Sequence, residues 1–173
     1  DNRNGLLWKD SSVDGVKTGH TEAAGYCLVA SAVRDGTRLM SVVMGTESTA
    51  ARETASSELL NYGFRFFETR KILSAGAELQ QVKIWKGDVE QVPVGVASDI
   101  FMTYPRGEKE SLQAQLMLST PIEAPVQKGQ QLGTVVITLK GEEQKSVPLV
   151  SLAAVNEGSF FSRMTDALML WFE

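Results

Sequence analysis

The first third of the chain contains apolar runs of strand length, followed by a segment whose apolar positions recur at helical spacing. We expect three antiparallel strands within residues 13–45, the second over 26–33 and the third over 39–44. Arg34-Asp35-Gly36-Thr37 would join these two as a hairpin, because Asp-Gly is a strong turn signal. The second strand is apolar at nearly every position, which predicts burial on both of its faces beneath helices.

A helix is expected after the third strand, capped by Ser48 or Thr49 and ending near Glu68. Its predicted buried stripe consists of five residues at helical spacing: Ala51, Ala55, Leu59, Tyr62 and Phe66. Gly63 lies inside this helix, where glycine costs about 1 kcal/mol relative to alanine. We therefore expect Gly63 to serve close packing against the sheet.

From about residue 70 the pattern changes to short β-prone runs separated by Gly, Pro and charged residues. The runs cover residues 81–85, 89–93, 100–104, 112–118, 131–139 and 145–152. Lys86-Gly87-Asp88 and Lys140-Gly141-Glu142 are turn signals between them. Strands at nearly regular spacing, without a long helical pattern, predict a small all-β domain of the sandwich type.

The tail from Ser159 returns to helical spacing. Its apolar residues fall on one face: Phe160, Phe161, Met164, Ala167, Leu168, Trp171 and Phe172. Arg163 is the single cation of this segment, against Asp166 and Glu173, so binding to a lipid surface would depend on apolar insertion. The alternative is a terminal helix that packs on its own β-domain. The fold class is thus α+β, with parts at residues 1–68, 69–157 and 158–173.

Composition narrows the classes of function. The 173 residues are 43% hydrophobic and 22% charged, which is ordinary for a globular protein. The net charge is −4 and no Lys/Arg cluster occurs, which argues against nucleic-acid binding. The single Cys27 excludes an internal disulfide, and one cysteine with one histidine, His20, predicts no metal site and no cofactor. No apolar run reaches the roughly 20 residues that span a bilayer.

Lys17-Thr18-Gly19 is the main candidate for chemistry. It places a cation, a hydroxyl and a residue without a side chain in consecutive positions of a predicted strand. Lys17 and Thr18 should point to opposite faces, and Gly19 allows another backbone to approach the strand edge. This arrangement suits an extended ligand that ends in a carboxylate. The alternative is an ordinary strand end with a solvated lysine.

Several segments together resemble a known family. They are Asn2-Arg3-Asn4-Gly5-Leu6-Leu7-Trp8, Val13-Asp14-Gly15-Val16-Lys17-Thr18-Gly19-His20-Thr21, Ala24-Gly25-Tyr26, Leu28-Val29-Ala30-Ser31-Ala32 and Gly63-Phe64-Arg65-Phe66-Phe67-Glu68-Thr69. The chain is similar over nearly its whole length to the low-molecular-mass penicillin-binding proteins of the type-5 class. These are serine-type D-alanyl-D-alanine carboxypeptidases with a β-lactamase/transpeptidase-like catalytic domain, in which K-T-G accompanies S-x-x-K and S-x-N.

The resemblance implies a role for each site residue. Lys17 would assist proton transfer at the nucleophile and attract the anionic substrate. Thr18 and Arg52 would bind the terminal carboxylate, Gly19 would keep the strand edge open, and the backbone N–H of His20 would donate to the oxyanion. The chain contains neither S-x-x-K nor S-x-N. We therefore expect it to be the C-terminal part of the enzyme, inactive without the N-terminal part.

The same resemblance implies the ligands and the location. The substrate would be a peptidoglycan pentapeptide ending in D-Ala-D-Ala, and β-lactam antibiotics would acylate the enzyme. The protein would act in the periplasm, attached to the outer face of the inner membrane by Phe160, Phe161, Met164, Leu168, Trp171 and Phe172. Two alternatives remain open at this point: a class A-like β-lactamase, and a non-catalytic membrane-docking module.

Overall fold

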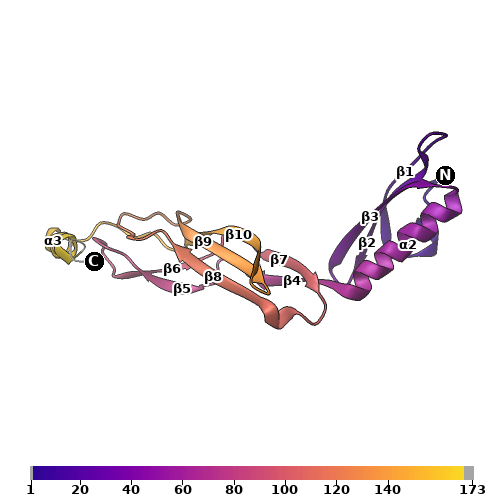
Figure 1. Cartoon of the computed structure of the whole chain (residues 1–173). Helices are drawn as coiled ribbons and strands as arrows, with labels where there is room; N and C mark the ends of the chain where they lie inside the picture. The colour runs from indigo at the N-terminus through magenta and orange to yellow at the C-terminus, as the bar shows by residue number, and fades with distance from the viewer. Residues whose placement is uncertain (1, 170–173) are drawn as a thin grey trace. The chain divides into compact units, whose positions relative to one another are not determined.

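The structure is a computed structural model that describes residues 2–169 (Figure 1). Its helices are α1 (Leu6–Lys9), α2 (Thr49–Phe66), the short 3₁₀ helix η1 (Lys109–Ser111) and α3 (Phe160–Met169). Its strands are β1 (Val13–Thr21), β2 (Gly25–Arg34), β3 (Thr37–Thr46), β4 (Phe67–Leu73), β5 (Gln80–Lys83), β6 (Gln91–Gly95), β7 (Ile100–Pro105), β8 (Leu112–Leu118), β9 (Gln131–Leu139) and β10 (Glu142–Ser151). The chain divides into unit 1, Asp1–Arg70 with Met102–Gly107, and unit 2, Lys71–Phe101 with Glu108–Glu173.

Unit 1 contains the three predicted strands as an antiparallel sheet in the order β1-β2-β3. The predicted β2–β3 hairpin is confirmed. Asp35 has φ +49° and Gly36 has φ +76°, the paired positive values of a tight hairpin turn whose twist matches its strands. This turn fixes the register, in which Arg34 pairs with Thr37 and Val29 pairs with Val42.

The helix α2 lies along one face of this sheet (Figure 1). The apolar core between them consists of Leu6, Val13, Leu28, Ala30, Ala32, Leu60 and Phe64. Gly63 contributes to this packing as predicted, because a Cβ there would lie 2.5 Å from a methyl group of Leu39. Burying the apolar side chains between α2 and the sheet stabilises the unit by roughly 25 cal/mol per Å² removed from water.

The predicted buried stripe of α2 is wrong. Leu59, Tyr62 and Phe66 are exposed, and Ala51 and Ala55 are half-buried. The buried residues are Arg52, Glu53, Ser56, Leu60 and Phe64. The spacing of apolar residues could not predict this face, because two of its buried residues, Arg52 and Glu53, are charged. Both are kept there by hydrogen bonds, which are described below.

The second face of the sheet is open in the part of the chain that the structure describes. Residues paired across antiparallel strands share a face, so Val29 lies beside Val42, and Ser31 beside Met40. Met40 and Val42 are exposed and Val29 is half-buried. The expectation that β2 is buried on both faces is therefore only partly met within residues 2–169: on the face away from α2, Ser31 is buried, Val29 is half-buried and Val33 is exposed.

An irregularity in β1 decides which of its residues face α2. Val13 pairs with Ala32 and Gly15 pairs with Ser31, so two residues of β1 advance against one of β2. Val13 is buried in the core beside Ala32. Beyond the irregularity, Val16 and Thr18 share the face of Ala30 and Leu28, whereas Lys17 shares the opposite face with Val29.

Unit 2 contains a five-stranded antiparallel sheet in the order β5-β6-β10-β9-β8, and its strands confirm the predicted β-rich part of the chain. The predicted strands at 112–118 and 131–139 have the observed bounds, and the others differ by a few residues. Lys140 and Gly141, at φ +53° and +84°, form the predicted turn between β9 and β10. The buried side chains of the sheet include Val82, Val92, Val94, Leu132, Val135, Ile137, Leu149 and Val150.

The strand β4 is missing from the predicted elements. Its sequence, Phe-Glu-Thr-Arg-Lys-Ile-Leu, has no clean alternation, and it pairs with β7 as a two-stranded sheet. The helix α2 ends at Phe66, two residues before the predicted end, because Phe67 already has extended backbone angles.

Candidate functional site

The Lys17-Thr18-Gly19 segment lies on β1, which is an edge strand of the sheet formed by the described residues. Lys17 and Thr18 point to opposite faces, as their partners Val29 and Leu28 show. The Lys17 ammonium donates to the backbone carbonyl of Thr18 at 2.9 Å. Cation and hydroxyl thus flank the exposed edge of a single strand, from which an extended ligand could be contacted on both sides.

All five residues that we predicted for the site line one open, polar hollow: Lys17, Thr18, Gly19, His20 and Arg52. The helix α2 supplies Arg52 from its first turn, and β1 supplies the other four. The hollow holds the side chains of several cationic residues, which suits an anionic ligand. The individual roles given to these residues stay predictions.

Arg52 has the most constrained side chain of the site, with only 4% of its surface exposed. Its Nη1 donates to the carbonyls of Gly19 at 3.3 Å and Cys27 at 3.4 Å, and its Nη2 donates to the carbonyl of Arg3 at 3.1 Å. Its Nε has no hydrogen-bond partner among residues 2–169. These bonds tie β1, β2 and the N-terminal segment to α2, so Arg52 holds the backbone of the hollow together.

Tyr26 and His20 form the aromatic part of the hollow. Their ring centroids lie 4.0 Å apart, and the Arg52 guanidinium carbon lies 5.7 Å from the Tyr26 ring centroid. A guanidinium over an aromatic face is stabilised by the ring quadrupole. Tyr26 therefore supports both neighbours from β2.

Five further residues line this hollow and were not predicted as site residues: Asn2, Arg3, Val16, Tyr26 and Thr49. Asn2 and Arg3 come from the segment before α1, which returns to the edge of β1 only in the folded chain. No local sequence pattern indicates that this segment will lie against β1. Tyr26 pairs with His20 across β1 and β2, so it could have been predicted once the register of these strands was known.

The described part of the chain contains no group of three or more His, Cys, Asp or Glu residues that could hold a metal ion. Within residues 2–169, no helix combines the length and the apolar character needed to cross a membrane.

The tail helix α3 exposes apolar side chains. Phe160, Met164 and Met169 are exposed, and Asp166 accepts a hydrogen bond from the backbone N–H of Lys86 at 2.6 Å. The side chains of Phe161 and Leu168, and the whole of Trp171 and Phe172, lie outside the described residues. Asp166 thus attaches α3 to the rest of unit 2, while the side chains of Phe160, Met164 and Met169 remain more than half exposed.

Comparison with known proteins gives two family matches. Residues 67–157 match the C-terminal domain of penicillin-binding protein 5, and residues 1–48 match the D-alanyl-D-alanine carboxypeptidase family. The first match covers more than half of the chain. The chain belongs to the penicillin-binding protein 5 family. The family resemblance predicted from its motifs is confirmed.

Relatives within the penicillin-binding protein 5 family agree over nearly the whole chain. D-alanyl-D-alanine carboxypeptidase DacA of Escherichia coli strain K12 is 46% identical over 173 residues, which are 99% of this chain and 43% of the relative. DacA of Haemophilus influenzae is 44% identical over 98% of this chain and 44% of its own length. The chain therefore spans less than half of the curated relatives it matches.

Solved structures of the penicillin-binding protein 5 family share the fold. Penicillin-binding protein 5 from Haemophilus influenzae has a TM-score of 0.82 and 44% identity, over 90% of this chain and 46% of that one. The carboxypeptidase DacD from Francisella tularensis has a TM-score of 0.67 and 36% identity, over 90% of this chain and 39% of that one.

Proposed function

We propose that the full-length protein containing this chain is a serine-type D-Ala-D-Ala carboxypeptidase that trims peptidoglycan pentapeptides and is acylated by penicillins. The observation that carries the proposal is the hollow at the edge of β1, where Lys17, Thr18 and Arg52 come together. The names of the relatives support it, because they are D-alanyl-D-alanine carboxypeptidases.

In this proposal the N-terminal part of the same protein supplies the nucleophilic serine. The serine Oγ attacks the carbonyl of the penultimate D-alanine, and the terminal D-alanine leaves. Water then hydrolyses the ester and regenerates the serine. Lys17 assists proton transfer, Thr18 and Arg52 bind the terminal carboxylate, and the His20 N–H donates to the oxyanion.

The open face of the unit 1 sheet supports an N-terminal part that packs there. Met40 and Val42 are exposed on this face, and Lys17 shares it. A partner that buries these side chains would also come close to the ammonium. Residues 1–68 would then complete a transpeptidase-like catalytic domain, followed by a β-sandwich over residues 69–157.

The test is covalent labelling of the full-length protein by a fluorescent penicillin. The wild type should retain the label, and Lys17→Ala should lower the labelling rate by about 100-fold or more, since general acid–base groups contribute about 10²–10⁴-fold. Lys71→Ala is the matched control, because Lys71 forms an exposed ion pair with Asp99 in unit 2. A folded wild-type protein that takes no label would refute the proposal, and rapid release of the label would favour a β-lactamase.

A second function concerns the tail. We propose that residues 158–173 form an amphipathic helix that attaches the protein to the outer face of the inner membrane, which places the enzyme in the periplasm. The exposure of Phe160, Met164 and Met169 on α3 supports this proposal. The same exposure is compatible with the alternative hypothesis, in which the chain is a non-catalytic module whose sole function is docking to the membrane.

Liposome flotation tests the tail. Deleting residues 160–172 should abolish flotation of the full-length protein, whereas Phe101→Ser, which removes an exposed aromatic side chain from β7, should leave it unchanged. Equal flotation of the deletion variant and the wild type would rule out attachment through this helix.

A further inference from the structure

The residue that follows Arg52 on α2 is a buried acid outside the hollow. Glu53 has only 6% of its surface exposed. One carboxylate oxygen accepts the backbone N–H of Gly5 at 3.1 Å, and the other accepts the Lys9 ammonium at 2.7 Å. A buried carboxylate is tolerated only where such partners replace water. Both partners belong to the segment of residues 2–9, so Glu53 ties this segment to α2.

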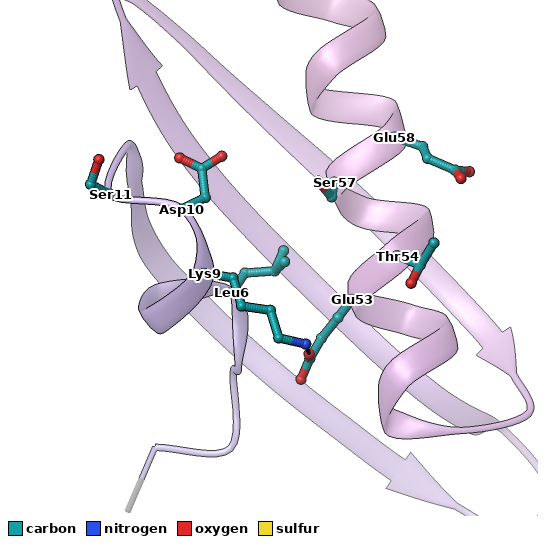
Figure 2. A pocket seen from close by; sticks show the side chains of 8 residues that line it. All are labelled: Leu6, Lys9, Asp10, Ser11, Glu53, Thr54, Ser57 and Glu58. Atoms are coloured by element: carbon teal, nitrogen blue, oxygen red, sulfur yellow. Dashed lines mark hydrogen bonds and ion pairs between the residues drawn. The ribbon is translucent and has the colours of Figure 1, made fainter.

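Figure 2 shows this contact from the hollow between α1 and α2. Lys9 and Glu53 point toward each other, whereas Glu58, a little more than one turn further along α2, points away from Lys9. Glu53 and Glu58 thus have the same chemistry on one helix, and Glu53 is the one that contacts the segment.

Gly5 can approach the Glu53 carboxylate closely because it has no side chain. Its backbone is in the ordinary right-handed helical region, with φ −66°, so no unusual dihedral angle requires glycine. A Cβ at this position would instead collide with the Glu53 carboxylate. The close approach of backbone to carboxylate is therefore the reason for glycine here.

Two further bonds complete the attachment of the segment. Arg52 Nη2 donates to the carbonyl of Arg3, and the Asn4 side-chain amide donates to the carbonyl of Gly15 on β1 at 3.2 Å. Asn4 is almost fully buried. The segment is thus held by α2 and β1 together, and its first residues, Asn2 and Arg3, form a wall of the hollow that contains Lys17.

We infer that Glu53 is a positioning residue of the carboxypeptidase site, which acts by holding the wall formed by Asn2 and Arg3. This inference rests on the proposed function. Asn2 and Arg3 precede α1, whereas Lys17 lies on β1. Loosening it should weaken substrate binding and leave the chemical step largely intact.

The experiment compares Glu53→Ala, Glu53→Gln and the matched control Glu58→Ala in the full-length protein. With a synthetic peptide ending in D-Ala-D-Ala, Glu53→Ala should raise KM about tenfold and change kcat less than about threefold. Glu53→Gln keeps an acceptor for the Gly5 N–H, so it should restore KM to within about threefold of wild type. Glu58→Ala should match the wild type. Equal losses in Glu53→Gln and Glu53→Ala, or a fall in kcat without a change in KM, would overturn the inference.

A structural readout keeps the test independent of catalysis. Amide hydrogen exchange of the peptide covering residues 2–9 should accelerate about tenfold or more in Glu53→Ala and stay unchanged in Glu58→Ala, because the Gly5 N–H loses its acceptor. Unchanged exchange in Glu53→Ala would overturn the inference. A wild type that neither turns over the peptide nor takes a penicillin label refutes the proposed function instead, and the exchange result is unaffected.

A second pair of variants covers the case in which Glu53→Ala fails to fold. Gly5→Ala should raise KM by the collision described above. Adding Glu53→Asp, which withdraws the carboxylate by one methylene, should recover part of this loss. Additive effects of the two substitutions would show that Gly5 and Glu53 do not act as a pair.

Discussion

At the scale of single residues, unit 1 uses charged side chains to hold its backbone in place. Arg52 donates to three carbonyls, and Glu53 accepts from one amide and one ammonium. Asp10 acts similarly in the turn before β1, where it accepts from the hydroxyl and N–H of Ser12 and from Arg34 at 2.7 Å. These contacts attach the early segment of the chain to the sheet and to α2.

Asp10 gives a prediction about pH. The hydrogen bond from the Ser12 hydroxyl, helped by the Ser12 N–H and Arg34, lowers the pKa of Asp10 below its ordinary value. A carboxylate with a lowered pKa in the folded state stabilises the protein above its unfolded pKa, and this stabilisation is lost as the pH falls through the folded pKa. Asp10→Asn should therefore lower the free energy of unfolding by about 1 kcal/mol at pH 7 and by progressively less below about pH 4.

Urea unfolding at pH 7 and at pH 3 measures this difference. Asp35→Asn, in the β2–β3 turn, is the control and should stay within about 0.5 kcal/mol of wild type at both values. A loss for Asp10→Asn that is the same at pH 7 and pH 3 would contradict the assigned role of the charge.

At the scale of elements, local signals found most of the secondary structure but not its packing. The hairpin at Asp35-Gly36 and the strands β8 and β9 follow from turn chemistry and alternation. The buried face of α2 does not, because Arg52 and Glu53 are buried through bonds to residues that are far away in the sequence. The strand β4 could not be found either, since its polar and apolar residues do not alternate.

The residues of the candidate site also fall into two groups, those that a local motif predicts and those that only the fold brings together. Its five predicted residues come from one short motif and one arginine, and motif chemistry is local. Asn2 and Arg3 reach the same hollow through the folding of the preceding segment. Only the three-dimensional structure brings residues so distant in the chain together.

The N-cap of α2 gives a prediction at this scale. The Ser48 hydroxyl accepts the N–H of Ala51 at 3.1 Å, and Ser48 has the extended backbone typical of a cap. Ser48→Ala should lower the free energy of unfolding by about 1 kcal/mol, because an N–H of the first turn loses its acceptor. Ser57→Ala, in the interior of the same helix, should cost clearly less, because it loses only an exposed 3.4 Å hydrogen bond from the Asn61 amide and gains helix propensity.

Thermal or urea unfolding of both variants tests the cap. Opposite or clearly different effects of the two substitutions are expected, and equal effects would argue that the Ser48 hydrogen bond contributes nothing. Arg52 lies in the first turn of α2. If Ser48→Ala causes this turn to fray, the bonds from Arg52 to the backbone around the hollow should also weaken.

At the scale of the whole molecule, the open face of the unit 1 sheet has a consequence for stability. Met40 on this face is 63% exposed, and Met117 on β8 of unit 2 is 62% exposed. The two residues have the same chemistry and the same exposure in this chain. Our proposal distinguishes them, because the N-terminal part of the protein would cover Met40.

In the full-length protein, Met40→Ser should lower the free energy of unfolding by about 2 kcal/mol, the order of magnitude for losing a buried apolar side chain. Met117→Ser should change it by less than about 0.5 kcal/mol. Urea unfolding of the two variants measures the difference. Similar small effects would show that the N-terminal part leaves this sheet face uncovered.

The irregular pairing between Val13 and Gly15 has a consequence for how evolution can alter this protein. Because one surplus residue precedes the motif, Lys17 lies on the face of Val29 and Thr18 on the face of Leu28, and not the reverse. Deleting Asp14 would only remove this irregularity, because Lys17 could still pair with Val29, whereas one residue inserted between Gly15 and Val16 would turn Lys17 toward α2 and Thr18 away from it. Such an insertion should thus abolish activity even though every residue of Lys17-Thr18-Gly19 is retained.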